Sequence, residues 1–245
     1  MNQRCITEGE WAESERVHRR ILEPTVSAFL TRRTKGTKHP VHDFLFTYYS
    51  FPASRLMRCH PGVGVTIVSD AGSNRLPDYI RSGLYVRNQH GYTLDVSRLE
   101  AKVLKRVEWM ANLCENIGRR RANVGCYGLH EWAMVYRERP EDVRHDGFPL
   151  RMGAEEIAAF VDSQTVRCTH FDAYRFFTAA ARPLNTVQPS MDRRLELEQA
   201  GCLHANMDLY KWAYKLSPWC SSDLVREAFL LAMWAREVDM RASPY

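Results

Sequence analysis

Residues 203–217 read LHANMDLYKWAYKLS, and this stretch indicates the fold class of the chain. Its apolar side chains recur every three or four positions, which is the spacing of neighbours on one face of an α-helix. They form two stripes, Leu203, Met207, Tyr210 and Tyr214, and Ala205, Leu209, Trp212 and Leu216. Two apolar stripes predict a helix that is buried over most of its circumference.

A third, narrow stripe of the same helix is polar and contains His204, Asp208, Lys211 and Lys215. This stripe either meets water or lines a polar pocket, and the sequence leaves both alternatives open. His204 and Asp208 share one face, so they can ligate one metal ion, or Asp208 can orient the imidazole. Alternatively, Asp208 and Lys211 form an ion pair along the helix.

Similar periodicity predicts further helices along the chain. The residues Ser97-Arg98-Leu99-Glu100 should form a capping box at the start of one helix. Thr169 and Asp172 have the same spacing and resemble a capping box with Asp in place of Glu. Pro24 should break or kink the first helix of the chain. The other predicted helices cover residues 10–30, 40–50, 129–138, 154–162, 170–181 and 222–240.

Residues 61–96 differ from the rest because short β-branched segments alternate there with Gly, Asn and Pro. This pattern predicts a loop-rich insertion with two or three short strands. We therefore expect a mostly α protein, in which residues 1–245 form a single helical domain with a small loop-rich β patch near 61–96.

Composition and charge exclude several classes of protein. The 245 residues are 45% hydrophobic and 26% charged, which is typical of a globular chain rather than a disordered one. No apolar run approaches the roughly 18 residues of a membrane span, and the first residues lack a signal region, so we expect a soluble, cytoplasmic protein without a membrane partner. The seven cysteines contain no CxxC motif, which favours free thiols over a cysteine-rich zinc site. The net charge of +5 permits nucleic-acid binding, although the basic runs at 32–38 and 119–121 are equally typical of solvated loops.

Four short segments place a histidine beside a carboxylate within apolar or aromatic surroundings. They are HPVHD at 39–43, HEW at 130–132, HFD at 170–172 and HANMD at 204–208. Histidine next to a carboxylate is the usual material of general acid–base catalysis and of metal sites. His130 and Glu131 are adjacent, so on a helix they diverge by about 100° and should not both face one pocket unless that pocket wraps the helix.

These segments also carry a family resemblance, which covers most of the chain from about residue 36 onward. Residues 39–49, 128–136, 170–177, 202–213 and 239–245 resemble an actinobacterial family commonly labelled 3-methyladenine DNA glycosylase. The resemblance implies a hydrolase of DNA repair. The Gly-rich hairpin of helix–hairpin–helix glycosylases is not matched, because Asn116-Ile117-Gly118-Arg119 lacks its second glycine pair, so no catalytic residue is carried over from those enzymes.

The first functional hypothesis is therefore an N-glycosidic hydrolase that releases alkylated bases from DNA without a cofactor. Such an enzyme flips the base out and stacks it on aromatic rings, while a carboxylate stabilises the cationic sugar or activates water. The partner would be DNA or a nucleobase-like small molecule. The expected catalytic residues are Asp208, His204 and Glu131, and the expected substrate-binding residues are His42, Tyr49, His130, His170, Tyr210 and Lys211.

The alternative is a metal-dependent oxidoreductase, an iron or manganese oxidase or oxygenase of the heme-oxygenase-like, helical-bundle type. Its ligands would be His42, His130, His204 and Asp208, which come from three predicted helices and should point into one cavity. The segments that supply these ligands contain no Glu-x-x-His pair, the usual spacing in di-iron carboxylate helices. A third hypothesis, a non-catalytic binding protein, would need all four histidine–carboxylate segments to be structural.

Overall fold

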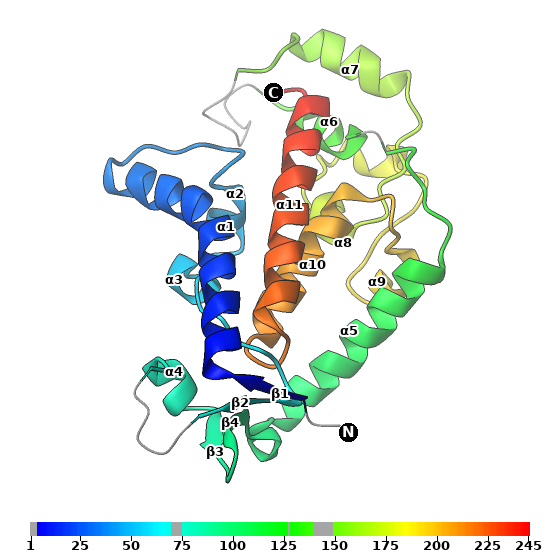
Figure 1. Ribbon diagram of the computed structural model, residues 1–245. Helices are drawn as coiled ribbons and strands as arrows, with labels where there is room; N and C mark the ends of the chain where they lie inside the picture. Colours follow the sequence, from blue (N-terminus) through cyan, green and yellow to red (C-terminus); the bar gives the residue numbers. More distant parts are fainter. Residues whose placement is uncertain (1–3, 70–74, 127, 140–148) are drawn as a thin grey trace. The chain divides into compact units, whose positions relative to one another are not determined.

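The computed structural model describes residues 4–69, 75–126, 128–139 and 149–245, and it confirms the predicted mostly helical fold with a small sheet (Figure 1). The chain separates into two compact units. Unit 1 contains Met1–Glu108 and Tyr210–Leu230, and unit 2 contains Trp109–Leu209 and Leu231–Tyr245. Each unit is described by itself below. Within the described ranges, no helix combines the length and the hydropathy that crossing a bilayer would require.

The sheet of unit 1 has the strand order β1-β2-β4-β3. Its strands are β1 (Arg4–Thr7), β2 (Val65–Val68), β3 (Tyr85–Arg87) and β4 (Gly91–Leu94). β1 pairs with β2 in parallel, whereas β4 pairs with both β2 and β3 in antiparallel fashion. The prediction of two or three strands in 61–96 is confirmed by β2, β3 and β4, whereas β1 was not predicted. Gly91 is required where β4 meets β2, because a Cβ atom there would lie 1.9 Å from the Ile67 carbonyl oxygen.

The long first helix, α1 (Glu8–Thr34), begins at a true capping box. The Thr7 hydroxyl accepts a hydrogen bond from the Glu10 N–H, while the Glu10 carboxylate accepts one from the Thr7 N–H. The helix continues through Pro24, so the predicted break at that residue is wrong. The remaining helices of unit 1 are short, α2 (Phe44–Tyr48), α3 (Ala53–Leu56) and α4 (Asp78–Arg81).

The helix predicted over 40–50 is shortened to α2 because local hydrogen bonds hold its first residues in a turn. The Nδ1 atom of His39 accepts hydrogen bonds from the N–H groups of Val41 and His42, at 3.3 and 3.2 Å. The carboxylate of Asp43 accepts the His39 N–H at 2.9 Å. These side chains satisfy the backbone donors that an additional helical turn would otherwise leave to water.

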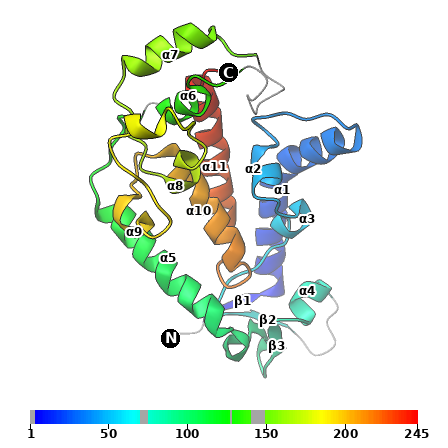
Figure 2. The same cartoon turned by 180° about the vertical axis from the view of Figure 1, so that it is seen from behind.

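The core of unit 1 lies between the sheet and the start of α1. The Trp11 indole donates a hydrogen bond to the Cys59 carbonyl at 3.2 Å, which fixes α1 against the chain that leads into β2. The view from behind shows the sheet below α1 (Figure 2). The buried cluster consists of Trp11, Cys59, Ile67, Leu76, Ile80, Tyr85 and Leu94.

Unit 2 is assembled from helices and irregular chain. Its own helices are α6 (Leu129–Val135), α7 (Ala154–Asp162), α8 (Phe171–Tyr174) and α9 (Arg194–Leu197). Three long helices contribute residues to both units, α5 (Ala101–Arg119), α10 (Leu203–Leu216) and α11 (Ser222–Ala242). The predicted helices at 154–162, 203–217 and 222–240 agree with α7, α10 and α11 to within two residues.

Three predictions about helix ends in 97–181 are wrong. Ser97 does not cap α5, because Asp95 instead caps a 3₁₀ turn at Val96–Arg98 and α5 begins only at Ala101. Thr169 does not cap α8, whose N-cap is His170 without a capping hydrogen bond from its side chain. The helix predicted over 170–181 is only the single turn α8, because the His170 side chain and the segment that follows are engaged in contacts across unit 2.

Candidate metal centre

Four titratable side chains of unit 2 meet in its interior. His130 and Glu131 come from α6, His204 from α10 and Asp239 from α11, and one ligand atom from each lies within 4.8 Å of all the others. His130 Nε2 lies 2.8 Å from Asp239 Oδ1. The exposed fraction is 3% for His130, 3% for Glu131 and 0% for Asp239, so His204 is the one partly exposed member of these four. This group is called the inner cluster.

The two carboxylates of the inner cluster share one buried guanidinium. The guanidinium of Arg236, which is 1% exposed, donates hydrogen bonds from Nη1 to Glu131 Oε1 at 3.1 Å and to Asp239 Oδ2 at 2.9 Å. One guanidinium balances at most one of the two carboxylate charges. Glu131 Oε2 and His204 Nδ1 are buried and have no hydrogen-bond partner among the described residues. Buried polar atoms are nearly always satisfied, so these two atoms are the unusual feature of the cluster.

Burial and neighbouring charges shift the pKa values of the cluster in different directions. Burial, together with the Asp239 charge, raises the pKa of Glu131 to about 7. Burial and the positive charge on His130 hold the pKa of His204 well below that of a free imidazole. At neutral pH His204 is therefore a neutral imidazole, which is the form that binds a metal ion.

Cys126 extends the inner cluster through His130. Its Sγ lies 3.1 Å from His130 Nδ1, on the opposite side of the ring from Asp239. Burial opposes charge on His130, but the charges of Cys126 and Asp239 outweigh it and raise the pKa of His130 well above the ordinary value. Burial likewise opposes a thiolate, but His130 outweighs it and lowers the pKa of Cys126.

A second group of charged side chains lies around His170 in unit 2 and is called the outer cluster. His170 Nδ1 lies 2.8 Å from Glu198 Oε2, and Glu198 accepts a hydrogen bond from Arg194 Nε at 3.0 Å. Arg194 Nη2 also donates to Asp208 Oδ2 at 2.7 Å. His170, Glu198, Arg194 and Asp208 are all at most 4% exposed. Asp172 completes the cluster, with Oδ2 at 3.7 Å from Arg194 Nη1.

The imidazole of His204 lies between the two clusters. Its ring centroid is 4.5 Å from that of His130 and 5.7 Å from that of His170. The polar stripe predicted on residues 203–217 thus lines a polar interior at the buried Asp208 and at the partly exposed His204. Asp208 contacts Arg194 and His170 rather than orienting His204.

The structure brings together some of the predicted site residues and not others. His130, Glu131 and His204 meet in the inner cluster, and Asp208 and His170 meet in the outer cluster. His130 and Glu131 are adjacent on the short helix α6 and both reach the inner cluster, because both side chains are buried in the interior of unit 2. This is the exception allowed above, in which the pocket wraps the helix. His42 belongs to unit 1, where its ring packs against His39 with centroids 4.2 Å apart.

The predicted substrate-binding residues Tyr49, Tyr210 and Lys211 contact one another in unit 1. The rings of Tyr49 and Tyr210 meet edge to face with centroids 6.0 Å apart, and the Lys211 ammonium lies 5.9 Å from the Tyr49 ring. Tyr210 is only 1% exposed and also packs against Phe229, with centroids 5.1 Å apart. Its ring is therefore part of the core and is not presented for stacking on a base.

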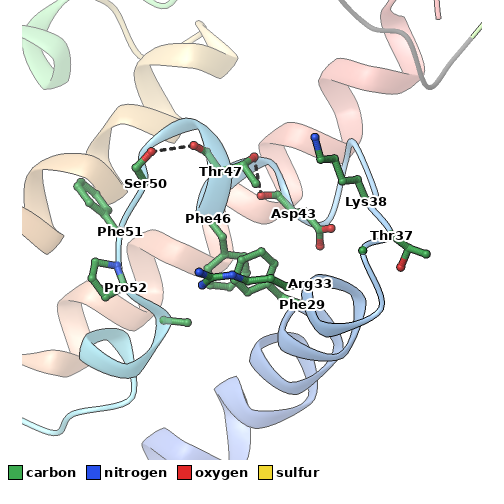
Figure 3. Close-up of a pocket in the computed structure, with 12 residues that line it drawn as sticks. Phe29, Arg33, Thr37, Lys38, Asp43, Phe46, Thr47, Ser50, Phe51 and Pro52 are labelled. Carbon is green, nitrogen blue, oxygen red and sulfur yellow. Dashed lines mark hydrogen bonds between the residues drawn. The ribbon is translucent and has the colours of Figure 1, made fainter.

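Part of the predicted basic run lines a cavity of about 590 Å³ in unit 1. Figure 3 shows Arg33 and Lys38 at this cavity together with Phe29, Phe46 and Phe51. Phe29 and Phe46 stack with centroids 4.3 Å apart. Arg33 and Lys38 are exposed, so both cations remain hydrated at the mouth of an open cavity.

Sequence reasoning did not identify four of the charged residues that build these clusters, Arg194, Glu198, Arg236 and Asp239. A signal was present for one pair, because Arg236 and Asp239 are three residues apart in an apolar helix and so share a face. Arg194 and Glu198 are four residues apart, but the sequence did not predict the single-turn helix α9 that places them on one face. Comparison of the chain with family models, curated proteins and solved structures found no match.

Proposed function

We propose that the chain is a metal-dependent oxidoreductase whose iron or manganese ion is held in unit 2 by His130, Glu131, His204 and Asp239. The observation that carries this proposal is the convergence of four ligand atoms, from three helices, within 4.8 Å of one another in a buried interior. Ligands bound at about 2.1 Å to one ion lie roughly 3 to 4 Å apart, close to this spacing.

The unsatisfied atoms support a metal ion over a simple hydrogen-bond network. Glu131 Oε2 and His204 Nδ1 have no hydrogen-bond partner among the described residues, although both are buried. An ion between the four side chains would satisfy both atoms.

The donor set favours iron or manganese. Two imidazoles and two carboxylates include the combination of two histidines and one carboxylate that non-heme iron enzymes use. Bound iron or manganese would supply one-electron and dioxygen chemistry. Around it, Arg236 holds the carboxylates in place, the apolar helices exclude water, and the partly exposed His204 marks the side from which a small substrate can approach.

Metal analysis of the purified chain, together with two variants, tests the proposal. We expect about one iron or manganese ion per chain at this site, and at least a tenfold loss of affinity in Glu131→Gln and in His204→Gln. Glu131→Gln should still fold, because burial already raises the pKa of Glu131 to about 7 and so favours its neutral form in the metal-free protein. His90→Gln is the matched control, because His90 is exposed and lies in unit 1.

Two results of this experiment would contradict the proposal. Protein that binds neither iron nor manganese after reconstitution would exclude the centre itself. Stoichiometric zinc that iron and manganese cannot replace would retain a metal site but turn the function toward hydrolysis.

DNA glycosylase activity, which the sequence resemblance implies, is a second candidate function. The observation that favours it is the cavity of unit 1, where Phe29 and Phe46 provide aromatic surface and Arg33 and Lys38 provide positive charge. Release of methylated bases from alkylated DNA tests it directly. Release that persists after chelation and is lost in the double variant Arg33→Gln/Lys38→Gln would favour the glycosylase over the metal-dependent enzyme.

A further inference from the structure

The outer cluster contains a second set of ligands. His170, Asp172 and Asp208 each offer one ligand atom, and these atoms lie within 4.8 Å of one another. His170 is 1% exposed and Asp208 is 4% exposed. Proximity of acidic groups alone does not indicate a bound cation. The additional observation is the way in which neighbouring side chains hold the His170 ring.

The hydrogen bonds of His170 prepare it as a metal ligand. Its Nδ1 lies 2.8 Å from Glu198 Oε2, and the neutral tautomer that donates from Nδ1 to this carboxylate has its lone pair on Nε2. Glu198 is itself 1% exposed and is fixed by Arg194. A carboxylate on one ring nitrogen is the arrangement that orients most metal-binding histidines and increases their basicity.

The other ring nitrogen of His170 faces a carboxylate across a gap. His170 Nε2 is buried and has no hydrogen-bond partner among the described residues, and it lies 3.7 Å from Asp208 Oδ2. This separation is too long for a hydrogen bond. It does suit two ligands of one ion, because ligands at about 2.1 Å are about 3.4 Å apart at a tetrahedral angle and about 4.2 Å apart when opposite.

The charges of the outer cluster also favour a cation. The Arg194 guanidinium contacts Glu198, Asp208 and Asp172, at 3.0, 2.7 and 3.7 Å. Arg175 Nε also lies 3.6 Å from Asp172 Oδ1, so these two guanidinium groups face three carboxylates in this cluster. Since buried charge is costly unless it is compensated, a divalent ion at this position would be stabilising.

We infer that His170, Asp208 and Asp172 form a second metal position, so that unit 2 holds a pair of iron or manganese ions. This inference rests on the proposed metal centre at the inner cluster. The ring of His204 lies between the two positions, at 4.5 Å from His130 and 5.7 Å from His170. Glu198 is a positioning residue, which acts on the ion through the His170 ring.

The test is titration of the metal-free chain with Mn²⁺, in which calorimetry and electron paramagnetic resonance measure the binding. The wild-type chain should bind two Mn²⁺ ions with a spin-coupled signal. Asp172→Asn should bind one ion and lose the coupling, and it should fold, because the Asp172 side chain is 15% exposed at the rim of the cluster. Asp192→Asn, the same change at an exposed position of unit 2, is the matched control.

The variant Glu198→Gln distinguishes a role of Glu198 in positioning His170 from a role in folding. It should lower the affinity for the second ion by about 10- to 100-fold, while the affinity for the first ion and the far-ultraviolet circular dichroism spectrum stay unchanged. Wild-type protein that binds a single ion, with the same stoichiometry in Asp172→Asn, would overturn the second position and leave the proposed function intact. Binding of no ion would overturn both.

Discussion

Two buried arginine side chains compensate carboxylate charge in the interior of unit 2. Arg236 and Arg194 are 1% and 4% exposed, and each guanidinium contacts more than one carboxylate. Removing one partner of a buried ion pair commonly costs about 3–5 kcal/mol, because the other charge is left uncompensated. Arg194 and Arg236 are therefore needed for folding as well as for the orientation of the ligands.

In unit 1, the pKa of His60 predicts how the free energy of unfolding depends on pH. Burial, with the nearby Arg58 charge, lowers the pKa of His60 to about 4, whereas the unfolded chain takes up the proton near 6.5. Between pH 4 and 6.5 the unfolded state thus binds more protons than the folded state. The folded state is therefore at its full stability above pH 6.5 with respect to His60, and it loses stability as the pH falls toward 4. The expected loss is about 3 kcal/mol.

Urea unfolding between pH 4 and 7 measures this effect. The variant His60→Gln retains a polar partner for the Tyr85 hydroxyl, which lies 3.0 Å from His60 Nδ1. It should show a shallower decrease of the free energy of unfolding with acid than the wild type. Part of the decrease should persist, because burial also lowers the pKa of His18. Identical acid dependence in the two proteins would contradict the assignment to His60.

At the scale of elements, the inner cluster depends on the close approach of α6 and α11. The Trp132 indole donates to the Ala242 carbonyl at 2.8 Å, and His130 and Asp239 meet across the same pair of helices. Gly128, just before α6, has a φ of +78°. A Cβ atom on it would lie 2.8 Å from the Ala242 Cβ.

Gly128→Ala should therefore move α6 away from α11. Positive φ costs a non-glycine residue about 1–2 kcal/mol, and the clash with Ala242 adds to this cost. Gly36→Ala is the control, because Gly36 also has a positive φ of +67° but has no atom within 4 Å of the added Cβ. We expect Gly128→Ala to lose at least about 1 kcal/mol more than Gly36→Ala. Metal affinity should fall in Gly128→Ala and stay unchanged in Gly36→Ala. An equal loss of stability in both variants would contradict this prediction, because it would show that the structure relieves the clash with Ala242.

At the scale of the whole molecule, the two units should respond differently to metal. Both clusters lie in unit 2, whereas the sheet and the core around Trp11 lie in unit 1. A ligand present at 100 times its dissociation constant stabilises the state that binds it by about 2.7 kcal/mol. Local opening is governed by the stability of each region, so this stabilisation should be concentrated in the unit that holds the ions.

Hydrogen exchange with and without Mn²⁺ measures this distribution. Amides of α6, of residues 203–209 and of residues 231–242 should exchange up to about 100-fold more slowly in the metal-bound protein. Amides of β2 and β4 should change little. Equal protection of the sheet would show that metal stabilises the whole chain as one cooperative unit or binds outside the two clusters.

The sequence by itself determined the helical class and the longest elements. The bounds of α7, α10 and α11 follow from apolar periodicity and capping residues, which act within a few positions of the chain. His130, Glu131 and His204 were recognisable as site candidates because a histidine or carboxylate in an apolar segment needs a partner wherever the chain folds.

Only the tertiary structure decided which partners these residues have. His130 and Asp239 are 109 residues apart, and His170 and Glu198 are 28 apart, so no local pattern connects them. The same holds for the short elements, because β1 exists through its pairing with β2, and α2 is cut short by the hydrogen bonds of His39 and Asp43. Local spacing fixes which residues share a face, whereas packing between distant segments fixes what that face meets.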